Sequence, residues 1–206
     1  RGNQQLTGAT TATITEKPKL LSSFQTGDDI KASPVVSGQT IFCGSTDGTM
    51  YAIGFDGKLK WKFASGNSIE APALAMDGAV LFGQLDGLFY KLDEENGKEV
   101  WKYKTDNQIM GSANWLKVAG KIRLFVGSYD YNLHCFGFDR GDSIWRYESD
   151  NYINGAPALY SKYAVFGGCD GFLHLVNIET GKVFKKIQLE TYIASSPVID
   201  GKFAYV

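Results

Sequence analysis

Two histidines stand out as possible chemical groups in this 206-residue sequence, because His134 and His174 lie about 40 residues apart. A fold that brings two imidazoles together can bind Zn²⁺ or Cu²⁺. However, each histidine stands at a position of a repeating pattern that Tyr51 and Tyr90 take in other repeats. The simplest occupant of such a position is a half-buried aromatic ring with a polar edge. We therefore predict a structural role for both histidines and no metal site.

Four aspartates also recur and could present a ring of carboxylates: Asp47, Asp86, Asp130 and Asp170. Each ends a Gly-x-x-Asp pattern, and glycine follows in every repeat except the third, where Tyr131 takes its place. Aspartate at the start of a hairpin turn more often accepts hydrogen bonds from the amides of the turn. We therefore predict turn-forming aspartates and expect Asn132 to take the left-handed position in the third repeat.

The three cysteines, Cys43, Cys135 and Cys169, show no spacing typical of metal ligands. An odd number of cysteines in an exported protein would be compatible with a pairing or reactive thiol. The simpler interpretation is that they are small buried hydrophobic residues. The sequence leaves their redox state open.

The elements that must position these residues form a repeat of about 40 residues. Each repeat starts with isoleucine and small residues, at 30–34, 69–72, 109–113, 153–157 and 193–197. Four segments follow in order: an apolar run, the Gly-x-x-Asp turn, an alternating run and a run with tryptophan four residues after glycine. These runs are too short for helices, and Asp-Gly between two of them indicates a hairpin. The pattern predicts an all-β propeller of four-stranded antiparallel blades.

The repeat spacing also predicts the domain organisation. We expect complete blades at about 28–66, 67–105, 106–149 and 150–190 and a partial fifth blade at 191–206. Residues 20–27 resemble the end of a blade and are expected to form the closing outer strand of the last blade. Residues 1–19 are expected to form a leader segment. A chain that stops inside a strand is expected to be part of a larger ring.

The segment 92–101 closely resembles the tryptophan-docking motif of the quinoprotein, or PQQ-like, β-propellers. Weaker copies cover 55–61 and 138–145, and a copy at 176–184 lacks the tryptophan. The first eight residues resemble the leader that follows the signal peptide in exported members of this family. The resemblance implies a parent ring of about seven or eight blades.

The resemblance also implies a structural role for the recurring tryptophans and glycines, which would dock adjacent blades. These residues are Trp61, Trp101, Trp145, Gly57, Gly97, Gly141 and Gly181. The alternative for the tryptophans is a platform on which a sugar or a base stacks. The resemblance favours docking.

Function divides this family. One branch comprises dehydrogenases that hold pyrroloquinoline quinone and calcium, and the other binds no quinone and includes the propeller lipoprotein of the outer-membrane β-barrel assembly machine. The fold cannot choose between the branches. This sequence has no adjacent cysteine pair, which the dehydrogenases typically carry, and its repeats are compact. We therefore expect a non-enzymatic, protein-binding scaffold without a cofactor; a quinoprotein dehydrogenase and a carbohydrate- or ligand-binding propeller are the alternatives.

Composition and charge restrict the partners. The net charge is −1 with scattered basic residues, which gives no footprint for nucleic acid. No apolar run is long enough to span a bilayer. The chain starts at Arg1 without methionine, so a signal peptide or lipid anchor would lie outside it. We expect an exported protein that is periplasmic, outer-membrane-associated or extracellular.

The candidate binding face consists of residues that vary at one fixed position, just after the isoleucine that begins each repeat. They are Lys31, Glu70, Met110 and Asn154. The loops around them are polar, and loops on a rigid scaffold are where propellers carry recognition. Trp115 is added because it replaces aliphatic residues beside a longer hairpin; the alternative is that it fills a local gap.

Overall fold

The computed structural model describes residues 3–13 and 16–206. The described residues form eighteen strands and no helix. In chain order these are β1 (Val35–Ser37), β2 (Thr40–Gly44), β3 (Thr49–Gly54), β4 (Leu59–Ala64), β5 (Leu74–Met76), β6 (Ala79–Gly83), β7 (Leu88–Asp93), β8 (Glu99–Lys104), β9 (Asn114–Val118), β10 (Lys121–Gly127), β11 (Asn132–Gly137), β12 (Ser143–Glu148), β13 (Ala158–Tyr160), β14 (Tyr163–Gly167), β15 (Phe172–Asn177), β16 (Val183–Gln188), β17 (Val198–Asp200) and β18 (Phe203–Tyr205). Within the described ranges, no helix has the length and apolarity to cross a membrane.

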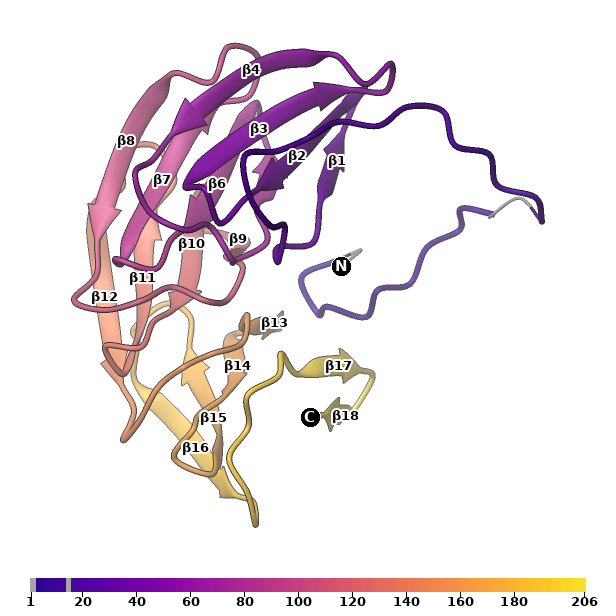
Figure 1. Ribbon diagram of the computed structural model, residues 1–206. Helices are drawn as coiled ribbons and strands as arrows, with labels where there is room; N and C mark the ends of the chain where they lie inside the picture. Colours follow the sequence, from indigo (N-terminus) through magenta and orange to yellow (C-terminus); the bar gives the residue numbers. More distant parts are fainter. Residues whose placement is uncertain (1–2, 14–15) are drawn as a thin grey trace.

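The strands form four four-stranded antiparallel sheets and one two-stranded sheet, each paired in chain order. The sheets β1–β4, β5–β8, β9–β12 and β13–β16 stand side by side in an arc, and β17–β18 starts a fifth blade (Figure 1). The predicted blades of an incomplete propeller are therefore confirmed.

One expectation about a turn is wrong. Tyr131 itself takes the left-handed conformation, with a φ of 72°, where Gly48 and Gly87 have φ values of 79° and 86°. Asn132 instead begins β11, and its backbone amide donates to Asp130 Oδ1 at 2.9 Å. The turn therefore keeps the geometry of the other blades, and the tyrosine accepts a conformation that usually requires glycine.

Neighbouring blades pack through a contact between a glycine and an isoleucine. A Cβ atom built on Gly83 would lie 2.2 Å from Ile109 Cγ2, and one on Gly127 would lie 2.3 Å from Ile153 Cγ2. Both isoleucines are fully buried. The glycine that ends the second strand of each blade and the isoleucine that begins the next repeat are thus two halves of one contact.

The segment before the first blade follows the path of an outer strand without forming one. The ring of Phe24 lies 5.5 Å from that of Tyr51, as Phe63 lies 5.3 Å from Tyr90 in the next blade. A Cβ on Gly57 would lie 2.8 Å from Ser22 Cβ. No strand pairs with residues 20–27 in the part of the chain that the structure describes, and their role as a closing outer strand stays a prediction.

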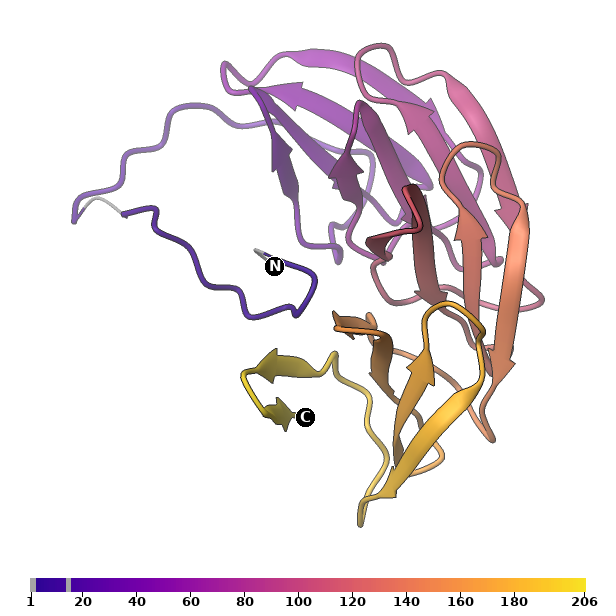
Figure 2. The same cartoon turned by 180° about the vertical axis from the view of Figure 1, so that it is seen from behind.

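The segment 3–6 lies inside the arc, near β13 and β17 (Figure 2). The Gln4 carbonyl accepts a hydrogen bond from the Leu159 amide at 2.8 Å, and the Gln5 carbonyl accepts one from the Ile199 amide at 3.0 Å. Leu6 packs against the apolar cluster shared by the fourth and fifth blades. Arg1 and Gly2 of the predicted leader lie outside the described residues.

Candidate functional site

Each recurring tryptophan docks on the following blade. The indole Nε1 of Trp61 donates to the Glu94 carbonyl at 3.0 Å, and that of Trp101 donates to the Phe138 carbonyl at 2.9 Å. Trp145 repeats the contact on the Ile178 carbonyl at 3.2 Å. These rings are enclosed between blades, which makes them poor platforms for a ligand.

Two features require glycine at the docking positions: a positive φ and the close approach of an indole ring. Gly97 and Gly141 have φ values of 71° and 68°. A Cβ on Gly97 would lie 2.6 Å from the ring of Trp61, and one on Gly141 would lie 2.7 Å from the ring of Trp101. Gly181 makes the same approach to Trp145. Any side chain here would push the indole away from its carbonyl acceptor.

Both histidines lie in hydrogen-bonded chains that join two blades. His134 Nε2 lies 2.9 Å from Asp130 Oδ2, and its Nδ1 lies 3.2 Å from the hydroxyl of Tyr103 on the preceding blade. An ionised carboxylate can only accept, so Nε2 donates to it and Nδ1 accepts from the tyrosine.

The same chain recurs at the next boundary. His174 lies 2.9 Å from Asp170 Oδ2 and 3.0 Å from the Tyr147 hydroxyl. In the first blade the hydroxyl of Tyr51 donates directly to Asp47 Oδ2 at 2.6 Å.

Burial decides what these chains can do. The exposed fraction is 3% for His134 and 0% for His174, so no substrate reaches either imidazole. Burial alone would raise the pKa of the Asp130 carboxyl, but hydrogen bonds from His134 and backbone amides outweigh it and hold this pKa at about 2. Burial lowers the pKa of His174 against the opposing effect of Asp170. The ionised carboxylate and the buried imidazole therefore have a structural role, since their hydrogen bonds hold neighbouring blades together.

The predicted turn role of the aspartates agrees with their contacts. Asp47 Oδ1 accepts from the Thr49 amide at 2.7 Å, and Asp86 Oδ1 accepts from the Leu88 amide at 3.1 Å. In residues 3–13 and 16–206, no group of three or more histidine, cysteine, aspartate or glutamate side chains is placed to hold a metal ion.

The cysteines form no disulfide within the described part of the chain. Cys43 and Cys135 are buried, and Cys169 is half-buried. Burial raises the pKa of the Cys135 thiol to about 12, which keeps it protonated and unreactive at neutral pH.

The structure brings part of the candidate binding face together. Lys31 Nζ lies 2.8 Å from Glu70 Oε1, and the Tyr129 hydroxyl donates to Asn154 Oδ1 at 3.2 Å. Met110 is half-buried in the same row of loops.

Trp115 does not join this row. It is half-buried and packs against the apolar cluster between the second and third blades, a position that fits the gap-filling alternative.

Sequence reasoning missed a group of tyrosines on these loops. The ring of Tyr152 lies 4.6 Å from that of Tyr129, nearly parallel to it, and 5.3 Å from that of Tyr131. Tyr131 and Tyr152 are each 39% exposed. The signal was present, since Tyr131 departs from the repeat at a glycine position.

The fold and these contacts define a β-propeller whose recurring polar and aromatic residues join blades. The sequence pattern of the family described as outer membrane protein assembly factor BamB matches residues 4–114 and 55–206. The chain therefore belongs to the PQQ-like repeat β-propeller family.

Solved structures agree on the fold. BamB from Moraxella catarrhalis superposes with a TM-score of 0.74 at 21% identity, over 86% of this chain and 55% of that one. The quinohemoprotein alcohol dehydrogenase ADHIIG from Pseudomonas putida HK5 superposes with a TM-score of 0.67 at 17% identity, over 82% of this chain and 36% of that one. Both likenesses concern the fold alone.

A curated relative with higher identity covers a short stretch. The lanthanide-dependent methanol dehydrogenase of Methylorubrum extorquens is 38% identical over 66 residues, which are 32% of this chain and 11% of that protein. The chain thus spans about half of the BamB structure and a small part of the dehydrogenase.

Proposed function

We propose that this protein is a non-enzymatic, exported β-propeller that binds protein partners in a cell-envelope or extracellular assembly. The observation that carries the proposal is the use of its chemically capable side chains. Both imidazoles and three of the four tryptophans serve contacts between blades, whereas the loops before each inner strand expose varied polar and aromatic groups. The likeness to a family named for outer membrane protein assembly supports the envelope location.

The residues present do not suit a quinone and calcium site. Calcium takes six to eight oxygen ligands. Of the four variable positions named above, Glu70 alone carries a carboxylate, and Lys31 and the Ser68 hydroxyl already bind it. We therefore propose that the protein binds neither pyrroloquinoline quinone nor calcium for catalysis.

Photo-crosslinking tests the scaffold role. A photoreactive amino acid is placed at Met110 in the full-length protein, and the matched control carries it at Lys162, in the turn between β13 and β14 at the opposite end of the strands. In the native envelope we expect a discrete protein adduct at Met110 and none at Lys162. Adducts of equal yield at both positions, or at neither, would contradict the proposal.

A quinoprotein dehydrogenase is the second candidate, favoured by the 38% identity with the methanol dehydrogenase over 66 residues. The full-length protein is incubated with pyrroloquinoline quinone and Ca²⁺ or a lanthanide and passed through a gel-filtration column. We expect no retained quinone and no dye reduction with alcohols or sugars. Stoichiometric retention with substrate-dependent dye reduction would establish the dehydrogenase instead.

A further inference from the structure

The charge of this propeller is divided unevenly between its surfaces. Two sets of loops meet at one end of the blades: the lead-in loops before each inner strand (28–34, 65–73, 105–113, 149–157 and 189–197) and the turns between second and third strands (45–48, 84–87, 128–131 and 168–171). Backbone hydrogen bonds join them, as from the Tyr129 amide to the Gln108 carbonyl at 2.9 Å. We call this surface the lead-in face.

The loops of the lead-in face contain ten acidic residues and one basic residue, although the whole chain has a net charge of −1. Asp130 and Asp170 are buried against His134 and His174, and Lys104 and Lys186 of the outer strands pair with Asp86 and Asp150, so the exposed excess of negative charge is smaller than this count. The acidic residues are Asp28, Asp29, Asp47, Glu70, Asp86, Asp106, Asp130, Asp150, Asp170 and Glu190. The basic residue, Lys31, is paired with Glu70. A surface with an excess of carboxylates attracts partners of the opposite sign and repels nucleic acid and anionic lipid.

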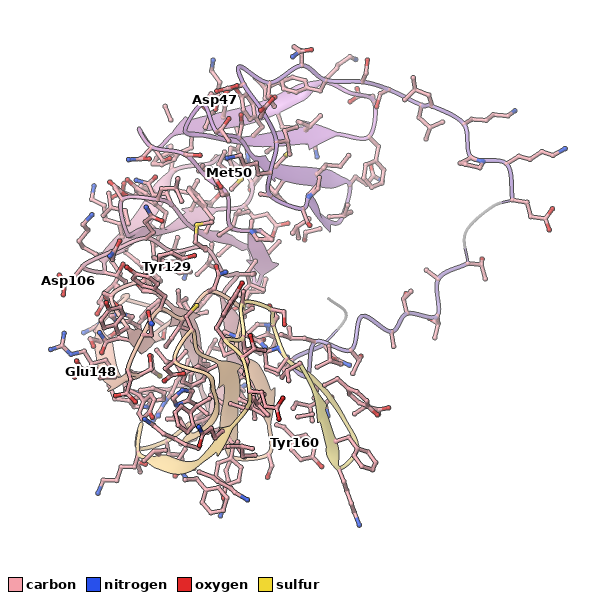
Figure 3. The ribbon with its side chains drawn as sticks, turned by 60° about the horizontal axis from the view of Figure 1, so that its bottom comes forward. Asp47, Met50, Asp106, Tyr129, Glu148 and Tyr160 are labelled. Carbon is pink, nitrogen blue, oxygen red and sulfur yellow. The ribbon has the colours of Figure 1, made fainter. Side chains whose placement is uncertain are left out.

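An exposed aromatic cluster lies within this acidic surface. Tyr129, Tyr131 and Tyr152 form the tyrosine cluster, with Tyr152 in contact with both other rings. The backbone amide of Asp106 donates to Asp130 Oδ2 at 3.1 Å, which places the acidic lead-in loop beside the cluster. Figure 3 shows Asp106 and Tyr129 on the same side of the arc and Tyr160 apart from both.

The other blades show that the fold does not require these tyrosines. Glycine occupies the Tyr131 position in the other three complete blades, and the Tyr152 position holds Asp29, Ser68 and Gln108 in the first three. The fifth repeat has an exposed tyrosine there, Tyr192. The rings of Tyr129 and Tyr131 pack on that of Tyr152 across the boundary of the third and fourth blades, and Tyr131 and Tyr152 still leave 39% of their surface exposed.

We propose that the tyrosine cluster, within the acidic lead-in face, binds an extended arginine-rich segment of a protein partner. A guanidinium group stacks on tyrosine faces and gains from both the ring and the surrounding carboxylates. Lysine gains less, because its ammonium group is more strongly hydrated and does not stack. The proposal rests on the protein-binding function proposed above and specifies the chemistry of the partner.

The test uses fluorescence anisotropy of the 206-residue chain with three labelled peptides, which alternate glycine with arginine, lysine or glutamate. We expect the arginine peptide to bind best, the glutamate peptide not to bind, and affinity to fall as added salt shortens the Debye length to about 8 Å at physiological ionic strength. Tyr131→Gly and Tyr152→Ser should each weaken arginine-peptide binding about three- to tenfold. Tyr160→Ser, an exposed tyrosine outside the cluster, should leave it unchanged.

Tyr131→Gly separates binding from folding, because it restores the residue of the other blades at a positive φ. This variant should be at least as stable as the parent in urea and still bind less well. Equal affinity of the tyrosine variants and the parent, or tyrosine-dependent binding of a neutral chito-oligosaccharide in place of the peptide, would overturn the proposal. A protein adduct at Met110 without peptide binding would refute this proposal alone, and absence of both would refute the protein-binding function as well.

Discussion

The chains of tyrosine, histidine and aspartate show, at the scale of single residues, how one position can hold two different aromatic side chains. The Tyr51 hydroxyl donates a hydrogen bond to the turn carboxylate of its blade, Asp47. His174 bonds to the corresponding carboxylate, Asp170, through Nε2, and its Nδ1 accepts a hydrogen bond from the Tyr147 hydroxyl. The histidine thus adds a second hydrogen bond across the blade boundary. It also adds an imidazole, whose pKa burial lowers from its ordinary value.

His174→Tyr should make the protein more resistant to mild acid. Burial holds the pKa of His174 below its ordinary value, so the unfolded chain binds the proton first and stability falls as pH drops below about 6.5. A tyrosine at this position can donate to Asp170 as Tyr51 donates to Asp47 and removes this step. Urea unfolding between pH 7 and 5 measures the effect; an identical pH dependence in both proteins would contradict it.

A second loss of stability should remain in the His174→Tyr variant at lower pH. The folded-state pKa of Asp130, about 2, lies below the ordinary value of 3.8, so its contribution is present above that value and disappears as pH falls toward 2. Urea unfolding extended from pH 5 down toward pH 2 measures this step, which serves as the internal control.

Trp101→Ala should lower the free energy of unfolding by about 3–5 kcal/mol, because it removes a large buried ring. The change also removes the hydrogen bond that the indole donates to the Phe138 carbonyl. Trp101→Phe is the matched variant and should lose less, since it keeps most of the packing. Urea unfolding gives both values. A Trp101→Ala protein with the stability of the parent would show that the ring does not hold the blades together.

At the scale of strands and turns, the sequence predicted the blades well because each strand is short, apolar and bounded by turn residues. It also predicted the tryptophan docking, through a family resemblance. It placed Lys31 and Glu70 at equivalent positions of neighbouring repeats but did not predict that their side chains pair. It could not place Gln4 and Gln5 near β13 and β17, because these contacts join residues far apart with no shared pattern. The left-handed Tyr131 was missed because propensity alone assigns that conformation to asparagine first.

Gly141→Ala should destabilise the protein more than the same change at Gly38. Both glycines have positive φ, but a Cβ on Gly141 would lie 2.7 Å from the ring of Trp101, whereas nothing lies within 4 Å of one on Gly38. Gly38→Ala should therefore lower the free energy of unfolding by only about 1 kcal/mol, the cost of placing alanine in the left-handed conformation. Thermal unfolding of both variants gives the comparison. Equal losses of stability in the two variants would show that the ring of Trp101 moves aside without a cost in free energy.

At the scale of the molecule, the end of the arc formed by the fourth blade and β17–β18 leaves apolar surface in solvent. Every residue of β16 and β18 is exposed, and Phe184, Phe203 and Val206 are exposed by 63%, 68% and 55%. A cavity of about 620 Å³ with a mainly apolar lining separates the fourth blade from β17–β18. In closed propellers a neighbouring blade covers such surfaces.

The 206-residue chain should therefore self-associate as its concentration rises, since open strands and apolar faces promote pairing. Light scattering coupled to gel filtration measures the mass. Phe203→Lys should reduce the association, and Val100→Lys, at an exposed position on β8 away from this cavity, is a control for added charge. A monomer at all concentrations would contradict this expectation.

The hydrogen bonds from Leu159 and Ile199 to the Gln4 and Gln5 carbonyls also set an order of events during synthesis. Each blade can pack on its predecessor as it leaves the ribosome, because blade contacts join neighbours in the sequence. The carbonyls of Gln4 and Gln5 must wait for their donors in β13 and β17, which are made about 150 residues or more later. This segment, made before the four blades, thus reaches its place only after them.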